Sequence, residues 1–166
     1  MDLTEAQLAA ADAVHRLVDR RETLATAESL TGGLVAATIV EIPGVSTVFR
    51  GGLVVYATDL KSSLAGVPDV LLAERGAVDP QVALELAVGA RERCGADWGL
   101  ATTGVAGPDP QDGKPPGLVY IAVAGAAGSA VRELKLDGNR AAIRTESVTS
   151  VLRLLSDTLQ EAASPA

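Results

Sequence analysis

The chain has 166 residues, of which 48% are hydrophobic, and its formal net charge is −7, so we expect residues 1–166 to form one domain with a substantial core. This negative charge argues against a nucleic-acid partner, because a phosphate backbone normally requires a basic surface. The chain has neither the roughly 18 uninterrupted apolar residues of a membrane span nor a segment typical of a signal peptide, so we expect a soluble cytoplasmic protein without a membrane partner.

Helices and strands are predicted to alternate along most of the chain. A capping box from Thr4 to Gln7 predicts a first helix that ends near Arg20 and Arg21, and a strand is expected over 23–27. The further predicted helices cover 31–41, 58–66, 69–75, 80–95 and 139–162, and Asp79 is expected to cap the one over 80–95. The further predicted strands cover 51–57, 97–103, 118–124 and 130–136. The last two strands favour a hairpin, and the whole order predicts a three-layer α/β/α fold with a mixed sheet of about five strands.

Side chains that commonly serve hydrolases are scarce in this sequence. Cys94 is the only cysteine and His15 the only histidine. A lone cysteine excludes an intramolecular disulfide and a multi-cysteine metal site. We expect Cys94 to be a buried apolar residue and His15 to lie at the surface of the first helix. A serine nucleophile in this chain would therefore need a base other than histidine.

The first predicted strand leads into a hydroxyl- and glycine-rich turn, Ser29-Leu30-Thr31-Gly32-Gly33. The helix after this turn would present unpaired N–H groups and the positive end of its dipole to Ser29 and Thr31. Such a corner suits an oxyanion or a phosphate. The alternative is that Ser29 or Thr31 only caps the helix and that the glycines only permit the turn.

A second corner follows the strand that ends at Tyr56, and it contains Lys61. Lys61 falls in the first turn of the helix predicted to begin near Thr58, where the helix dipole disfavours a positive charge. The same field would lower the pKa of the amine toward the range of a general base. The alternative is an ordinary lysine that extends into water.

Arg140 and Arg144 crowd the start of the last predicted helix, which Asn139 is expected to cap. A phosphate or carboxylate ligand would offset this accumulation of positive charge at a positive helix end. The alternative is that the arginines pair with the neighbouring carboxylates of Asp137 and Glu146.

The glycine-rich loop over 104–117 differs from a nucleotide triphosphatase loop. Five residues separate Gly107 from Gly113 where four are required, and Pro115 replaces the Ser or Thr. The prolines of this loop predict a stiff connection that either shapes a pocket wall or only turns the chain. Asp109 and Asp112 do not form a metal-ligand pattern.

Together these segments resemble the CinA C-terminal domain family, the nicotinamide-mononucleotide amidohydrolases (deamidases) of pyridine nucleotide salvage. The resemblance runs from about Leu8 to Leu159 and rests on four segments in order, Ala27 to Gly33, Gly52 to Lys61, Thr103 to Pro108 and Gly138 to Arg140. It implies hydrolysis of nicotinamide mononucleotide to nicotinic acid mononucleotide and ammonia, with no metal or organic cofactor. Leu30 departs from the pattern, because relatives often carry a cysteine there.

The resemblance implies that Ser29 is the nucleophile and Lys61 its base, with Tyr56 relaying a proton or orienting the amine. Backbone amides around Thr31, Gly32 and Gly33 would hold the oxyanion. The residues expected to bind the small-molecule substrate are Thr31, Gly32, Gly33, Thr103, Gly104, Arg140 and Arg144. A homo-oligomer is expected from the Ala-, Val- and Leu-rich composition.

Two alternatives to this activity are open. One is a noncatalytic nucleotide- or partner-binding domain linked to competence or the damage response, as the family name suggests. The other is an amidase for a different small amide.

Overall fold

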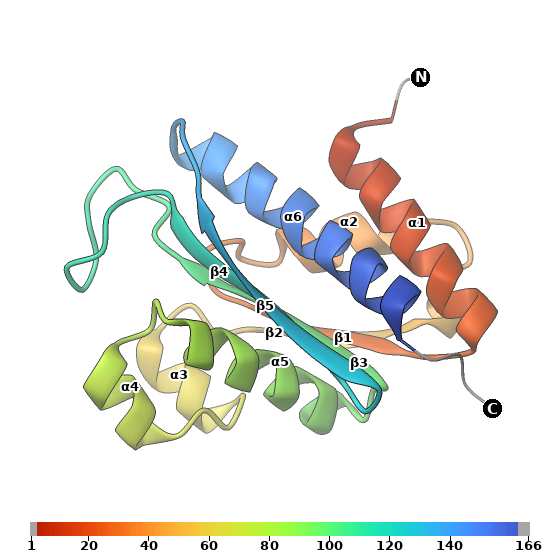
Figure 1. The fold of residues 1–166 in the computed structure, drawn as a ribbon, viewed down its shortest axis with the longest axis horizontal. Helices are drawn as coiled ribbons and strands as arrows, with labels where there is room; N and C mark the ends of the chain where they lie inside the picture. The colour runs from red at the N-terminus through yellow and green to blue at the C-terminus, as the bar shows by residue number, and fades with distance from the viewer. Residues whose placement is uncertain (1–2, 163–166) are drawn as a thin grey trace.

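A five-stranded mixed sheet forms the centre of the structure, a computed structural model that describes residues 3–162 (Figure 1). The strands lie in the order β2-β1-β3-β4-β5. β1 pairs in parallel with β2 and β3, whereas β4 pairs antiparallel with β3 and β5, which confirms the predicted mixed α/β sheet. The strands are β1 (Leu24–Glu28), β2 (Phe49–Val54), β3 (Trp98–Gly104), β4 (Leu118–Gly125) and β5 (Gly128–Lys135).

Helices cover both faces of the sheet, and Figure 1 shows them as one layer above it and one below. The upper layer consists of α1 (Glu5–Arg20), α2 (Leu34–Val40) and α6 (Arg140–Glu161), and the lower layer of α3 (Thr58–Ser63), α4 (Asp69–Arg75) and α5 (Pro80–Cys94). A short 3-10 turn (Val45–Thr47) precedes β2. Because the strands alternate their side chains between the two faces, the sheet buries one aliphatic cluster against each layer.

Side chains cap three helices as the sequence predicts. The Thr4 hydroxyl accepts from Gln7 N at 3.1 Å, and the Gln7 side chain accepts from Thr4 N at 2.9 Å. The Asp79 carboxylate accepts from the backbone of α5, and the Asn139 side chain accepts from Ala142 N at 2.9 Å. These contacts satisfy N–H groups that have no partner within their own helix.

The corner after β1 is longer than predicted, because α2 begins at Leu34 and not at residue 31. Gly32 and Gly33 have positive φ angles of 59° and 102°, which a right-handed helix cannot include. β2 likewise ends at Val54, so Tyr56 lies just beyond the strand. His15 is exposed as expected, whereas Cys94 is half-buried and not fully buried.

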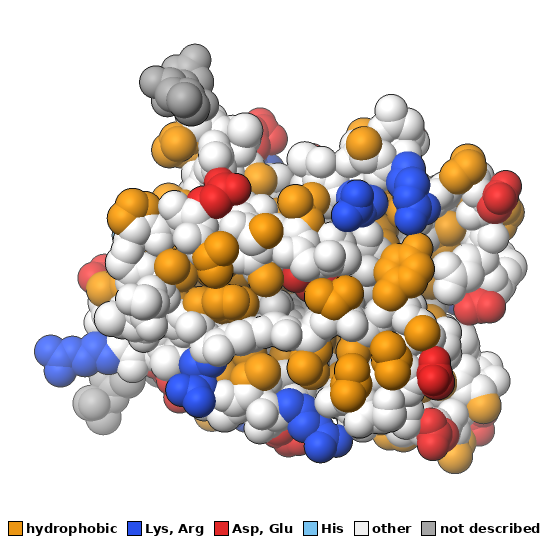
Figure 2. Space-filling view, turned by 180° about the vertical axis from the view of Figure 1, so that it is seen from behind, with side chains coloured by type: hydrophobic (Ala, Val, Ile, Leu, Met, Phe, Trp, Pro, Cys, Tyr) orange, Lys and Arg blue, Asp and Glu red, His pale blue; other side chains and the backbone are white. Residues whose placement is uncertain are grey.

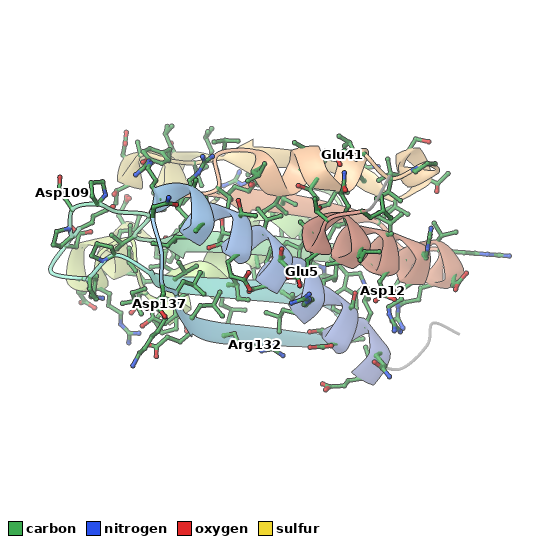
Figure 3. All side chains as sticks on the ribbon, turned by 90° about the horizontal axis from the view of Figure 1, so that it is seen from above. Glu5, Asp12, Glu41, Asp109, Arg132 and Asp137 are labelled. Atoms are coloured by element: carbon green, nitrogen blue, oxygen red, sulfur yellow. The ribbon has the colours of Figure 1, made fainter. Side chains whose placement is uncertain are left out.

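The three parallel strands end at the same edge of the sheet, and this edge carries the predicted corners. Figure 3 shows Asp109, from the loop after β3, at the end of the molecule where α6 begins, with Asp12 toward the opposite end. No helix within residues 3–162 is long and apolar enough to cross a membrane.

β2 is an edge strand, and the view from behind Figure 1 shows hydrophobic side chains spread across that face (Figure 2). The exposed apolar side chains include Val40, Val54 and Tyr56, which are 53%, 48% and 60% exposed. Tyr56 follows the end of β2, at the edge of the sheet that also carries the other predicted corners.

Candidate active site

Ser29 and Lys61 lie in direct contact, although 32 residues separate them in the sequence. Lys61 Nζ donates to Ser29 Oγ at 2.9 Å and to the backbone carbonyl oxygens of Val55 at 2.8 Å and Tyr56 at 3.2 Å. The Lys61 side chain is buried, at 1% exposure, and Ser29 is 7% exposed. The fold thus brings together the two residues that the sequence predicted to react.

Burial lowers the pKa of Lys61 from its ordinary 10.5 to about 8. Within residues 3–162, no carboxylate forms an ion pair with this amine, so no opposite charge offsets the cost of burying it. The predicted cause was wrong: Lys61 lies in the last turn of the six-residue α3, away from the positive end of the helix dipole. The low pKa comes from the surrounding protein and not from the helix.

The partners of Lys61 determine where its lone pair points. A neutral lysine has two N–H groups and one lone pair, and a carbonyl oxygen can only accept a hydrogen bond. When the carbonyls of Val55 and Tyr56 accept hydrogen bonds from both N–H groups, the lone pair of the amine faces Ser29 Oγ. The neutral amine can then accept the hydroxyl proton of Ser29, as nucleophilic activation requires.

The Glu28 carboxylate occupies the start of α2. It accepts from Val35 N at 2.8 Å, from Ala36 N at 3.1 Å and from the Thr31 hydroxyl at 2.6 Å. A negative charge is favourable at this end of a helix, and Glu28 is 1% exposed. Sequence reasoning assigned no role to Glu28, although a carboxylate just before a glycine turn and a helix was the available signal.

The prediction that the first amides of α2 are open to Ser29 is therefore wrong, because Glu28 occupies them. Neither Ser29 nor Thr31 caps the helix, whose N-cap is Gly33 without a side-chain hydrogen bond. The Gly32 amide donates to the Ser29 carbonyl at 3.1 Å and is engaged within the turn. Oxyanion binding by the amides of Thr31 and Gly33 stays a prediction.

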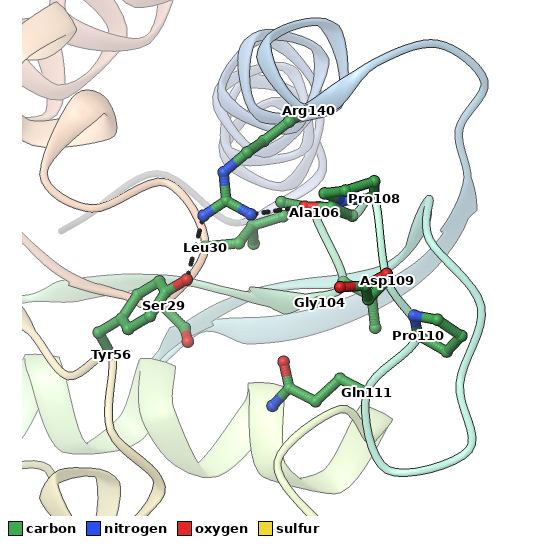
Figure 4. Close-up of a pocket in the computed structure, with 12 residues that line it drawn as sticks. Ser29, Leu30, Tyr56, Gly104, Ala106, Pro108, Asp109, Pro110, Gln111 and Arg140 are labelled. Carbon is green, nitrogen blue, oxygen red and sulfur yellow. Dashed lines mark hydrogen bonds between the residues drawn. The ribbon is translucent and has the colours of Figure 1, made fainter.

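A pocket of about 380 Å³ opens beside Ser29, which is within the range of small-molecule sites (Figure 4). Ser29, Leu30 and Tyr56 line one side of it, and Arg140 and the loop over 104–111 line the rest. The expectation that this loop shapes a pocket wall is confirmed. Gly104 lines the pocket, and a Cβ there would lie 2.7 Å from a Val119 methyl group, so glycine permits the close packing.

Arg140 connects the two sides of the pocket. Its Nη1 donates to the Gly107 carbonyl at 2.6 Å, and its Nη2 donates to the Tyr56 hydroxyl at 3.1 Å (Figure 4). These bonds use two of the five N–H donors of the guanidinium, so further donors remain for a ligand. Neither Arg140 nor Arg144 forms an ion pair with Asp137 or Glu146, so the predicted alternative of local charge pairing is wrong.

Arg144 is not among the residues that line the pocket. Its Nε donates to the Leu30 carbonyl at 2.9 Å, and its Nη2 donates to the Thr31 carbonyl at 3.1 Å. The two arginines expected to share one anionic ligand therefore have different surroundings.

Two threonines on β3 are buried behind the pocket. The Thr103 hydroxyl donates to the Ala77 carbonyl at 2.7 Å, so this predicted substrate-binding residue is engaged with the protein. Thr102, which sequence reasoning missed, has its hydroxyl 2.8 Å from that of Thr31, and its carbonyl accepts from Ser29 N at 3.1 Å. No local signal marks Thr102, because its role depends on the pairing of β3 with β1.

Comparison with known proteins assigns the family. Residues 6–159 match a family model described as the CinA C-terminal domain. A "CinA-like protein" of Frankia casuarinae is 52% identical over 139 residues, which are 84% of this chain and 32% of that protein. A "putative competence-damage inducible protein" of Desulforamulus reducens is 45% identical over 144 residues, which are 87% of this chain and 35% of that protein. This chain spans about a third of the length of these curated relatives.

Solved structures agree with the family model over nearly the whole chain. The competence/damage inducible protein CihA from Agrobacterium tumefaciens is 35% identical with a TM-score of 0.90, covering 97% of this chain and 100% of that one. The competence damage-inducible protein A from Klebsiella pneumoniae is 27% identical with a TM-score of 0.90, covering 94% and 98%. This chain therefore belongs to the CinA C-terminal domain family.

Proposed function

We propose that this protein is a serine amidohydrolase that converts nicotinamide mononucleotide and water to nicotinic acid mononucleotide and ammonia. The observation that carries the proposal is the contact of Lys61 Nζ with Ser29 Oγ, made while the amine also donates to the carbonyls of Val55 and Tyr56. This pair supports acyl transfer by a serine nucleophile, and both the amide bond and the choice of substrate come from the family resemblance.

In the first half of the reaction, neutral Lys61 accepts the Ser29 proton while Ser29 Oγ attacks the carboxamide carbon. Lys61 then returns this proton to the amide nitrogen, the carbon–nitrogen bond breaks, and ammonia leaves. In the second half, Lys61 takes a proton from water, and the hydroxide attacks the acyl carbon. Lys61 returns this proton to Ser29 Oγ as the ester bond breaks, which releases the carboxylic acid product and restores the Ser29 hydroxyl and the neutral amine.

Tyr56 supports this chemistry through two different groups. Its backbone carbonyl accepts from Lys61 and so helps to orient the amine, which is one of the two roles expected of this residue. Its hydroxyl is bonded by Arg140 at the pocket. We assign the anionic phosphate of the substrate to Arg140, because a guanidinium offers paired donors to phosphate oxygens.

The test is ammonia release, with chromatography of the product, from nicotinamide mononucleotide incubated with the wild-type protein or with Ser29→Ala. Both reactions contain a chelator, so that a contaminating metal enzyme does not contribute. The proposal expects nicotinic acid mononucleotide and ammonia from the wild type alone. Equal product from both proteins would remove Ser29 from the reaction.

The remaining outcomes distinguish the alternatives. Saturable binding of nicotinamide mononucleotide without turnover, unchanged in Ser29→Ala, would identify a noncatalytic binding domain. Turnover of another small amide in a substrate panel, dependent on Ser29, would keep the mechanism and replace the substrate.

A further inference from the structure

Arg144 contacts the turn that follows the proposed nucleophile. Its guanidinium donates to two consecutive carbonyls, those of Leu30 and Thr31, at 2.9 and 3.1 Å. These residues come directly after Ser29 and belong to neither β1 nor α2. Arg144 thus ties the start of α6 to a segment more than 110 residues earlier in the chain.

The backbone of this turn, and not the space around it, favours glycine at position 32. Gly32 has a φ of 59°, whereas a Cβ built on it would make an ordinary van der Waals contact with Arg144 Nη2 at 3.6 Å. The guanidinium thus lies close against the turn. Hydrogen bonds from a charged donor are stronger than neutral ones, and two of them on adjacent peptide groups fix the orientation of both planar units.

The other side of the same turn is also held. The Thr31 hydroxyl donates to Glu28, and the Gly32 amide donates to the Ser29 carbonyl. Without Arg144, the Leu30 and Thr31 carbonyls lose this charged donor, whereas these other contacts remain. The expected effect is a shift of the turn, and of Ser29 with it, and not loss of the fold.

We propose that Arg144 is a positioning residue, which holds Ser29 in line with Lys61 through the Leu30 and Thr31 carbonyls, and that Arg140 alone contacts the substrate anion. This inference rests on the proposed amidohydrolase function. Two arginines that lie four residues apart on one helix would then have different roles, one in positioning Ser29 and the other in binding the substrate anion.

The experiment compares Arg144→Ala with Arg140→Ala, using nicotinamide mononucleotide and nicotinamide riboside, which lacks the phosphate. Arg144→Ala should lower kcat by about 10- to 100-fold for both substrates with little change in KM, because a displacement of about 1 Å costs up to 100-fold in rate. Arg140→Ala should raise KM for the mononucleotide by about 10-fold or more, and should have little effect on KM for the riboside.

A second readout does not depend on the substrate. The rate at which a fluorophosphonate labels Ser29 should fall in Arg144→Ala and stay near the wild-type rate in Lys135→Ala, because the Lys135 side chain is 81% exposed and does not line the pocket. If nicotinamide mononucleotide is not a substrate, this labelling still tests the positioning role. If the wild type neither turns over the mononucleotide nor labels, the nucleophile and the positioning role are both refuted.

Two results would overturn the inference while leaving the proposed function intact. One is that Arg144→Ala raises KM for the mononucleotide and not for the riboside, which would make Arg144 an anion contact. The other is unchanged kcat and unchanged labelling. Circular dichroism shows whether Arg144→Ala is folded. If it is not, Arg144→Lys tests the positioning role, because lysine keeps the charge but not the paired donors. Both kcat and the labelling rate should still fall in Arg144→Lys.

Discussion

The burial of Lys61 predicts an unusual dependence of stability on pH. Burial lowers its pKa from 10.5 to about 8 in the folded protein, whereas the unfolded chain should keep the ordinary value. Below pH 8 both states carry the proton, and above pH 10.5 neither does. Between these limits the unfolded state binds one proton more than the folded state, so the free energy of unfolding rises with pH.

The magnitude follows from the two pKa values. Each pKa unit corresponds to about 1.4 kcal/mol, so burial of the Lys61 ammonium should cost about 3 kcal/mol below pH 8, and this cost should disappear as the pH rises through the window. The methionine of Lys61→Met has a similar shape and no charge, so this variant should lack both the cost and its dependence on pH. The Val55 and Tyr56 carbonyls lose their donor in the variant.

The assay is urea unfolding of the wild type and Lys61→Met at several pH values between 7 and 11. The free energy of unfolding of the wild type minus that of the variant should increase by about 3 kcal/mol over the window. Other titrating groups cancel in this difference. Lys135, whose side chain is 81% exposed, provides the matched control: Lys135→Met should show no such trend.

The activity of the wild type should rise with pH and level off above about pH 8, because only neutral Lys61 can accept the Ser29 proton. Lys61→Met should be folded and inactive. A stability difference that does not change between pH 8 and 10.5 would mean that the pKa of Lys61 is not lowered, and would refute the reasoning. A variant that keeps the wild-type rate would remove Lys61 from catalysis.

Two further predictions concern the packing beneath the site. Gly52→Ala should destabilise the protein by about 1–3 kcal/mol, because its Cβ would lie 2.3 Å from Thr26 Oγ1; Gly51→Ala, which meets nothing within 4 Å, is the control. Adding Thr26→Ala should restore part of the loss in urea unfolding, and no recovery would place the strain elsewhere. Glu28→Gln should lower the free energy of unfolding by about 1–3 kcal/mol, because the NH2 group of the new amide would face the N–H group of Ala36, and both are donors. An unchanged urea midpoint would contradict this role of the carboxylate.

The sequence was sufficient to predict the elements that position the site. Asp79 and Asn139 marked the starts of two helices, and the alternation of helices and strands indicated the layered sheet. These signals are local, since a cap or a periodic pattern depends on residues a few positions apart. The segments that carry Ser29 and Lys61 could therefore be placed at strand ends before their contact was known.

The contacts between segments could not be predicted in the same way. Lys61 was expected to have a low pKa because of its helix, but its burial depends on how α3 packs against the sheet. The amides of α2 were expected to be open, but the preceding Glu28 side chain folds back onto them. Arg140 and Arg144 looked equivalent by spacing, and only the tertiary structure separates them.

The site is assembled from separate segments of the chain that have two different roles. The proposed reacting pair comes from residues 29 and 61, whereas most of the pocket wall comes from the loop over 104–111 and from Arg140. Substitutions in that loop can alter the shape and charge that a ligand meets without changing the groups around the Lys61 amine. Under the proposed function, the fold therefore allows the choice of amide to diverge among relatives while the bond-breaking chemistry stays the same.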